Sequence, residues 1–406
     1  MPSLIALIEN EFVSRYSSKS KRLEDVLATD EDCAAFIRQV LDDASYSIAG
    51  ATRNKKQYDF SKDRAKHSVI TYFMGLILAK FGDLEARINS LMPESGTFEH
   101  LWMLTALYHD WGYYSDRINN GSLKLRSVVK HYLLSDIDLD SRLGKLANYE
   151  ISHPEALAYS YDEIEEYDAY ARRYHGLRPN DYEKIDHGIL GGVIIYDRLI
   201  KKALGFGKND ECLAAKASCV TIAQHNIFKS SSEKMDLEYG SRLKKLFHDS
   251  SFVITTETPL LFLLSLVDTI ECVKRFSGES NKDRYFHTKT VLSNIELDVS
   301  RERIRIDYRK FRTAIEKKNK NVLEASLAER YRKYTDGILS FDHWTSVRAS
   351  YDTTSNDVIQ IEPITSYWFL QPHMGIDDKE EIEEDPEETK KKEELFYKIL
   401  MEEEPS

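Results

Sequence analysis

An apolar run that ends in a histidine and an aspartate constrains this chain more than any other stretch. Apolar residues recur at helical spacing across residues 98–107, which predicts a buried helix. His109 and Asp110 follow directly, so an imidazole and a carboxylate are expected at the edge of the core. Such groups bind Zn, Fe, Mn and similar divalent ions. Adjacent residues of a helix point about 100° apart, so His109 and Asp110 can bind one metal only if the helix ends near them. Gly112 is a residue that can end the helix at this point.

Composition and charge leave the class of substrate open. The 406 residues are enough for one large domain or two to three smaller ones. The formal net charge is −12, but residues 376–406 carry 14 acidic and 5 basic side chains. The remaining body is therefore close to neutral, which argues neither for nor against a nucleic-acid partner.

Cysteine usage and hydropathy indicate a reducing, aqueous compartment. The four cysteines show no paired spacing and fall within apolar helical patterns, which favours buried free thiols. No signal peptide is visible at residues 1–8, and the longest apolar run, residues 260–267, is too short to span a bilayer. We expect a soluble, cytoplasmic protein with no membrane partner.

The first half of the chain reads as helical. Amphipathic stripes predict helices within residues 1–50 and again over residues 62–81, where His67 begins an apolar face. A longer segment, residues 115–186, is rich in tyrosine and carries several arginines. It is either a helical insertion packed on the body or a lid that offers aromatic and guanidinium groups to a nucleotide.

Three further helices carry isolated polar residues. One opens at Asp186, directly before His187, and another runs from about residue 210 to His225. A third begins at Pro259 and stays apolar until Asp268. An acid within such an apolar helix is costly unless it is paired, so Asp268 is a strong candidate ligand.

The C-terminal part changes to strand patterns. Alternating apolar residues predict a hairpin over residues 295–306, followed by a helix over residues 308–338 and strands at 346–351 and 358–363. The predicted organisation is a helical domain over residues 1–290, a small α+β domain over 291–375 and an acidic tail over 376–406. We expect the tail to be solvated, partly disordered or helical.

Six candidate ligands therefore lie at or near helix ends. A helical bundle builds an internal metal site when several helices each contribute one polar residue. Four imidazoles and two carboxylates are enough for two metals bridged by one carboxylate, an arrangement that activates water against a phosphoryl group. The candidates are His67, His109, Asp110, His187, His225 and Asp268.

The order of these motifs resembles the HD superfamily of metal-dependent phosphohydrolases across about half of the chain, residues 67–276. The likeness is greatest to the bacterial HD proteins that split dinucleoside polyphosphates, which show His-Ser, His-Asp, His-Gly, a helix-ending His and Asp-x-Ile-Glu near an Arg. The corresponding residues here are His67-Ser68, His109-Asp110, His187-Gly188, His225 and Asp268-Thr269-Ile270-Glu271 with Arg275.

The resemblance implies a mainly α, HD-type bundle and a role for each residue of the motif. The first metal would be held by His67, His109, Asp110 and Asp268, and a second would be completed by His187 and His225 with Asp110 bridging. The two ions would be Fe, Mn, Mg, Ni or Zn. The expected catalytic residues are Asp110, His187 and His225. Glu271 would orient one of the metal-binding side chains without binding the metal itself. Arg275 would either bind phosphate or form an ion pair with Glu271.

The chain departs from the family pattern in two places. Many phosphodiester-cleaving HD proteins read His-Asp-x-Gly-Lys, whereas Tyr113 stands here at the lysine position. The stretch between Asp110 and His187 is also far longer than in the compact enzymes. Three of its arginines, Arg172, Arg173 and Arg178, are candidates for the missing phosphate-binding cation.

Three functions remain open at this point. The first is hydrolysis of a phosphodiester or phosphoanhydride bond in a nucleotide. The second is a nuclease acting on single-stranded DNA or RNA, as in the related RNase Y and CRISPR helicase-nuclease families. The third is a non-catalytic nucleotide sensor, which the complete set of six ligand positions disfavours. The nearly neutral body and the absent lysine favour a small nucleotide. The sequence gives no oligomeric state.

Overall fold

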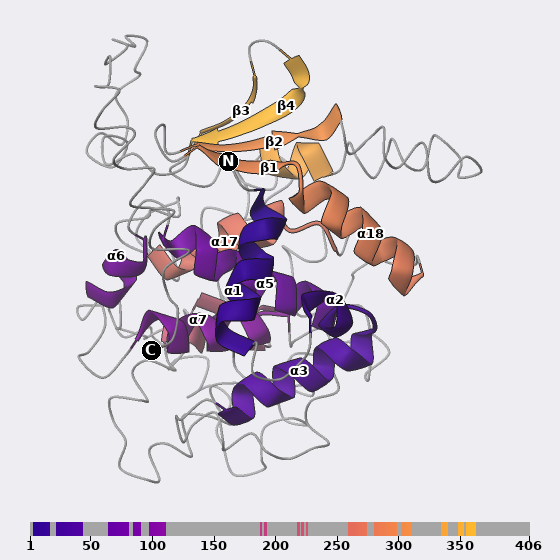
Figure 1. The fold of residues 1–406 in the computed structure, drawn as a ribbon. Coiled ribbons are helices and arrows are strands. Elements are labelled where there is room, and N and C mark those ends of the chain that lie inside the picture. Colours follow the sequence, from indigo (N-terminus) through magenta and orange to yellow (C-terminus); the bar gives the residue numbers. More distant parts are fainter. Residues whose placement is uncertain are drawn as a thin grey trace, which may run out of the picture.

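The computed structural model shows a mainly helical protein with a small antiparallel sheet near the C-terminus, which confirms the coarse fold predicted from the sequence (Figure 1). It describes residues 3–16, 22–43, 64–80, 84–90, 97–110, 259–273, 280–298, 303–309, 334–339, 348–352 and 355–362. It also describes short pieces at 187–188, 191–192, 217–219, 221–222 and 225.

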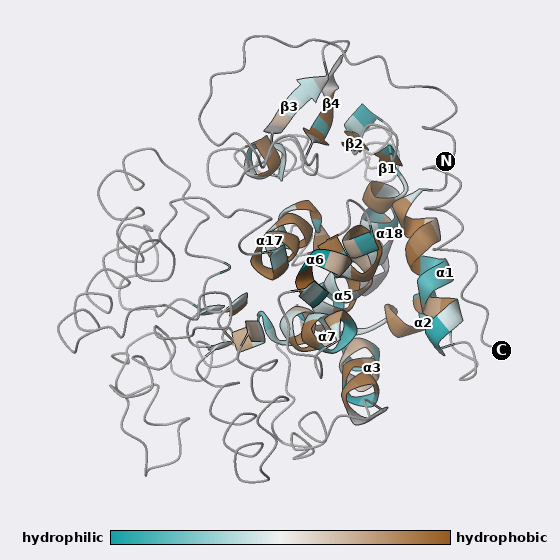
Figure 2. Ribbon diagram, turned by 90° about the vertical axis from the view of Figure 1, so that its left-hand side faces the viewer, coloured by the Kyte–Doolittle hydropathy of each residue, from teal (hydrophilic) through white to brown (hydrophobic). Residues whose placement is uncertain are grey.

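The helices gather around one central helix, α5 (Figure 2). The sequence predicts one apolar face for it, but every residue from Ala65 to Ala79 is buried. The difference arises because neighbouring helices contact α5 on several sides, so even its polar residues are enclosed. The helices have the bounds α1 (Leu4–Tyr16), α2 (Leu23–Val26), α3 (Asp30–Asp43), α5 (Ala65–Lys80), α6 (Leu84–Ser90), α7 (Phe98–Tyr108), α17 (Pro259–Ile270) and α18 (Asn281–Leu292).

A glycine allows α5 and α7 to approach closely. A Cβ atom on Gly75 would lie only 1.8 Å from Cζ2 of the Trp102 side chain, which is fully buried. The Trp102 indole N–H donates to the backbone carbonyl of Tyr72 at 2.7 Å. The indole therefore occupies the space that a larger residue at position 75 would need, and it fixes the spacing of two helices that carry candidate ligands.

A capping residue and a proline mark where α7 and α17 begin. The Thr97 hydroxyl accepts the backbone N–H of His100 at the start of α7. The helix ends at Tyr108, so His109 and Asp110 stand just beyond it. Pro259 opens α17, where its missing N–H costs nothing.

The sheet has the order β1-β2-β4-β3 and is antiparallel throughout. Both predicted strand pairs are present, as β1 (Ile295–Asp298), β2 (Arg303–Asp307), β3 (Arg348–Asp352) and β4 (Ser355–Glu362). One face is apolar, because the register aligns buried residues that alternate with polar ones. The aligned residues are Ile295, Leu297, Ile304, Ile306, Ile359 and Ile361.

The apolar face of the sheet belongs to the same hydrophobic core as the helices. The first helix, α1, contacts strand β1. The Tyr334 hydroxyl donates to the backbone carbonyl of Ile270 at the end of α17. The helix predicted over residues 308–338 is helical at both of its described ends, 308–309 and 334–339. In the described part of the chain, no helix is long and apolar enough to cross a membrane.

Candidate metal centre

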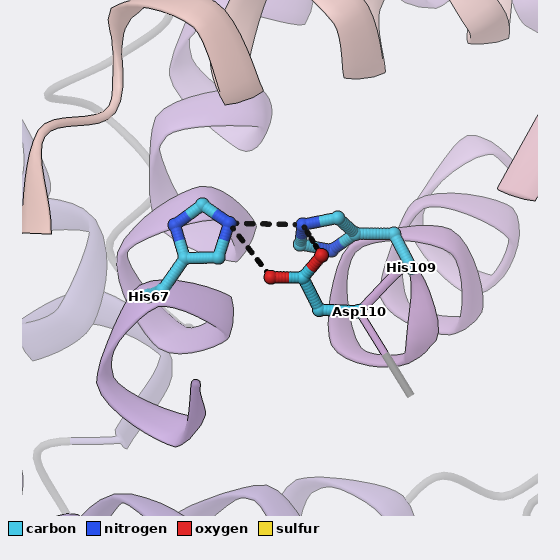
Figure 3. Close-up of side chains that lie close together, drawn as sticks. All are labelled: His67, His109 and Asp110. Atoms are coloured by element: carbon cyan, nitrogen blue, oxygen red, sulfur yellow. Dashed lines mark hydrogen bonds and ion pairs between the residues drawn. The ribbon is translucent and has the colours of Figure 1, made fainter. Parts of the chain in front are cut away.

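The structure brings all six predicted ligands into one buried cluster. His67 lies in the first turn of α5, and Asp268 lies in the last turn of α17. His109 and Asp110 follow α7, and Figure 3 shows these two side chains turned toward His67. The short piece that precedes His225 is held against α7, because the Ser218 hydroxyl donates to the Leu101 carbonyl at 3.1 Å.

The first half of the cluster is formed by His67, His109 and Asp268 together with one oxygen of Asp110, and we call it the His67 half. The Nε2 atom of His67 lies 3.0 Å from Nε2 of His109 and 3.1 Å from Oδ1 of Asp268. It also lies 3.4 Å from Oδ2 of Asp110. The second carboxylate, Asp268, is 3.8 Å from Nε2 of His109. One nitrogen and two oxygens, from His109, Asp268 and Asp110, therefore lie within 3.4 Å of Nε2 of His67.

The second half is formed by His187, His225 and the other oxygen of Asp110, and we call it the His187 half. The Nε2 atom of His187 lies 3.2 Å from Nε2 of His225 and 3.3 Å from Oδ1 of Asp110. The two halves adjoin, since the ring centroids of His109 and His225 are 5.4 Å apart. Asp110 thus directs Oδ2 toward His67 and Oδ1 toward His187, and Oδ1 also lies 3.6 Å from Nε2 of His109, where the two halves meet.

Hydrogen bonds behind the rings fix which nitrogen faces the centre. The Nδ1 atoms of His109 and His225 lie 2.8 Å and 2.6 Å from the carbonyl oxygen three residues earlier. A carbonyl only accepts, so Nδ1 carries the hydrogen, and Nε2 of the neutral ring presents a lone pair. On His67, Nδ1 is bonded to the Glu271 carboxylate. Lone pairs facing each other at about 3 Å repel, and a cation between them removes this repulsion.

The spacing of the donors fits a metal ion. Ligand atoms at about 2.1 Å from one ion lie roughly 3.0 Å apart at right angles and roughly 3.4 Å apart in a tetrahedron. Five of the seven donor-atom separations quoted for the two halves fall close to these values, and the other two, from His109 to Asp268 and to Asp110, are 3.8 Å and 3.6 Å. All six side chains are buried, so water competes little for them. The groups His67–His109–Asp110 and Asp110–His187–His225 could therefore each hold a metal ion.

Arg64 adds a positive charge that the sequence analysis did not identify. Its Nη1 atom lies 3.0 Å from Oδ2 of Asp110, and its side chain is 20% exposed. Burial alone would raise the pKa of Asp110, but Arg64, then His109, His187 and His67, hold that pKa well below its usual range. Asp110 is therefore ionised and ready to bind a cation. The sequence does carry one signal for this role: Arg64 precedes His67 by three residues, about one helical turn, which places the two on one side of a helix.

Several predicted features lie outside the described residues. They include the insertion over residues 115–186, the helix stop at Gly112, Tyr113 at the lysine position and the acidic tail. The four arginines proposed to contact substrate also lie outside, namely Arg172, Arg173, Arg178 and Arg275. Their roles remain predictions.

No protein-family model, curated protein or solved structure matches this chain. The chemistry of the buried cluster must therefore carry the functional argument.

Proposed function

We propose that the protein is a metal-dependent phosphohydrolase with an HD-type helical bundle and two metal ions bridged by Asp110. Its substrate would be a nucleotide, cleaved at a phosphodiester or phosphoanhydride bond. The observation that carries this proposal is the orientation of the Asp110 carboxylate, with Oδ2 toward His67 and Oδ1 toward His187. Different imidazoles lie at its two oxygens, His67 at Oδ2 and both His187 and His109 at Oδ1. A carboxylate shared in this way can bridge the two ions of a dinuclear centre.

The types of donor support hydrolysis. The cluster contains imidazoles and carboxylates, which suit Zn, Fe, Mn and similar ions that act on phosphate groups. When bound, two such ions supply an activated water and neutralise charge on a phosphoryl oxygen. The order of the ligands along the chain, which resembles the HD superfamily, supports the same class of reaction.

The protein's own residues have three tasks in this proposal. The hydrogen bonds behind His67, His109 and His225 hold the rings in place, so little reorganisation is needed when the ligands act. Burial excludes bulk water and strengthens the interactions among charged groups. Arg64 contributes a permanent guanidinium charge beside Asp110, where a phosphate oxygen can accept from it. It is a candidate for the cation that Tyr113 does not supply.

A hydrolysis assay with two classes of substrate tests the proposal. The protein, supplied with Mn²⁺, is incubated with a dinucleoside polyphosphate, a cyclic dinucleotide, nucleoside triphosphates, and single-stranded DNA and RNA. We expect release of phosphate or mononucleotide from a small nucleotide, loss of activity with a chelator and loss in His109→Ala. The Glu296→Gln variant, altered on strand β1, serves as the matched control and should stay active.

Two outcomes would change the conclusion. Cleavage of the nucleic acids alone would replace the nucleotide substrate with the nuclease alternative. Tight nucleotide binding without turnover of any substrate would leave the sensor alternative and overturn the phosphohydrolase proposal.

A further inference from the structure

The two halves of the cluster differ in what stands behind their ligands. In the His67 half, Nδ1 of His67 is bonded to the side chain of Glu271. In the His187 half, Nδ1 of His225 is bonded to the backbone carbonyl of Ile222. A carboxylate is a stronger acceptor than a carbonyl, and it makes the opposite ring nitrogen a better metal donor.

Glu271 is held so that its charge acts on His67. Its side chain is fully buried just beyond the end of α17. One oxygen, Oε2, contacts His67, and the other, Oε1, accepts the backbone N–H of Val273 at 2.5 Å. Both oxygens are thus engaged, and the carboxylate lies directly behind the imidazole whose Nε2 faces the centre. Glu271 is a positioning residue, because it acts on the centre only through His67.

The negative charge is also distributed unequally. Among the described residues, the His67 half contains the whole carboxylate of Asp268, one oxygen of Asp110 and the nearby charge of Glu271. The guanidinium of Arg64, beside that Asp110 oxygen, offsets one of these negative charges. Among the same described residues, the His187 half contains two imidazoles and the other oxygen of Asp110. Each added carboxylate strengthens the attraction for a divalent cation, particularly in a buried site.

We propose that the two halves bind metal with unequal affinity and in a fixed order. The His67 half binds its ion first and retains it, and Glu271 sets this preference through His67. The His187 half takes a second, exchangeable ion. If the proposed phosphohydrolase function holds, the availability of divalent metal then controls the active fraction by filling the His187 half.

Metal titration of the full-length chain tests this order without measuring activity. The protein is stripped with a chelator, and Mn²⁺ is added while free Mn²⁺ is followed by electron paramagnetic resonance. We expect two binding steps in the unaltered protein, with Kd values at least tenfold apart. His225→Ala should lose the weaker step and keep the tighter one.

Variants of Glu271 and a control separate its charge from its shape. Glu271→Gln keeps the size of the side chain and an acceptor for Val273, but it removes the carboxylate behind His67. We expect the tighter Kd to weaken about ten- to a hundredfold and the weaker Kd to change less than threefold. Glu296→Gln, whose partner Arg305 lies on the neighbouring strand, should change neither step.

Two results would overturn the inference. One is a pair of indistinguishable binding steps in the unaltered protein, which needs no variant to fold. The other is loss of the tighter step in His225→Ala while the weaker step stays. A protein that shows the expected order but hydrolyses no nucleotide would retain this inference and reject the proposed function.

Discussion

Replacing Gly75 by alanine should separate α5 from α7. The added Cβ would lie 1.8 Å from Cζ2 and 2.0 Å from Cε2 of Trp102, whereas carbon atoms in proteins rarely approach closer than about 3.4 Å. The indole is fully buried and bonded to the Tyr72 carbonyl, so it cannot turn aside freely. Either the indole moves and loses that bond, or the two helices move apart.

The expected cost follows from these contacts. Overpacking a core costs about 1–3 kcal/mol, and leaving the indole N–H without its acceptor costs about 1–3 kcal/mol more. The helix propensity of alanine over glycine returns about 1 kcal/mol. Gly75→Ala should therefore lower the free energy of unfolding by about 1–5 kcal/mol, measured by urea denaturation in the presence of a chelator.

A double-variant cycle isolates the contact with the indole. Trp102→Leu alone should destabilise through the cavity it leaves, by less than the roughly 3–5 kcal/mol typical of Trp→Ala. In the double variant Gly75→Ala/Trp102→Leu, the added methyl group fits into the space that the indole leaves. The destabilisation of the double variant should therefore be at least about 1 kcal/mol less than the sum of the two single-variant destabilisations. A Gly75→Ala cost below about 0.5 kcal/mol, or strictly additive effects, would show that the described packing of α5 on α7 is wrong.

Three further predictions concern the cluster and its surroundings. Asp268→Ala should abolish activity, because the Asp268 carboxylate lies 3.1 Å from His67 in an apolar helix. Asp268→Asn should still fold, with a near-normal circular dichroism spectrum. Normal turnover by the alanine variant would make Asp268 purely structural. Arg64→Gln should raise the pKa of Asp110, because Arg64 is the largest influence that lowers this pKa against burial. On acidification, the variant should therefore lose Mn²⁺ binding at a higher pH than the unaltered protein does. Identical pH profiles of Mn²⁺ binding would contradict this prediction. Within the insertion, alanine at Arg172, Arg173 or Arg178 should reduce kcat/KM roughly ten- to a hundredfold if that arginine binds phosphate, whereas changes below about twofold in all three would indicate surface ion pairs.

The sequence predicts the elements well where one local signal dominates. Pro259 followed by an apolar run predicts α17, and alternating residues predict both hairpins of the sheet. The burial of α5 on every side was not predicted, because a short window of sequence shows periodicity but not which neighbours will cover the polar positions.

The membership of the candidate site is predictable, but its geometry is not. The order of His67, His109-Asp110, His187, His225 and Asp268 indicates one cluster, and the structure brings these residues together. Which Asp110 oxygen faces His67 and which faces His187 depends on the angle between α7 and its neighbours, which no local pattern encodes. The contact of Arg64 with Asp110 becomes visible only when the start of α5 is known, because the helix then aligns Arg64 with His67.

The central claim is that Asp110 joins two metal sites, and anomalous X-ray diffraction from Mn²⁺-loaded crystals tests it most directly. We predict two anomalous peaks about 3.5–4 Å apart, one beside His67, His109 and Asp268 and the other beside His187 and His225, with one Asp110 oxygen on each. Peaks that leave Asp110 without a bound ion, or a single ion held away from the imidazoles, would contradict the account.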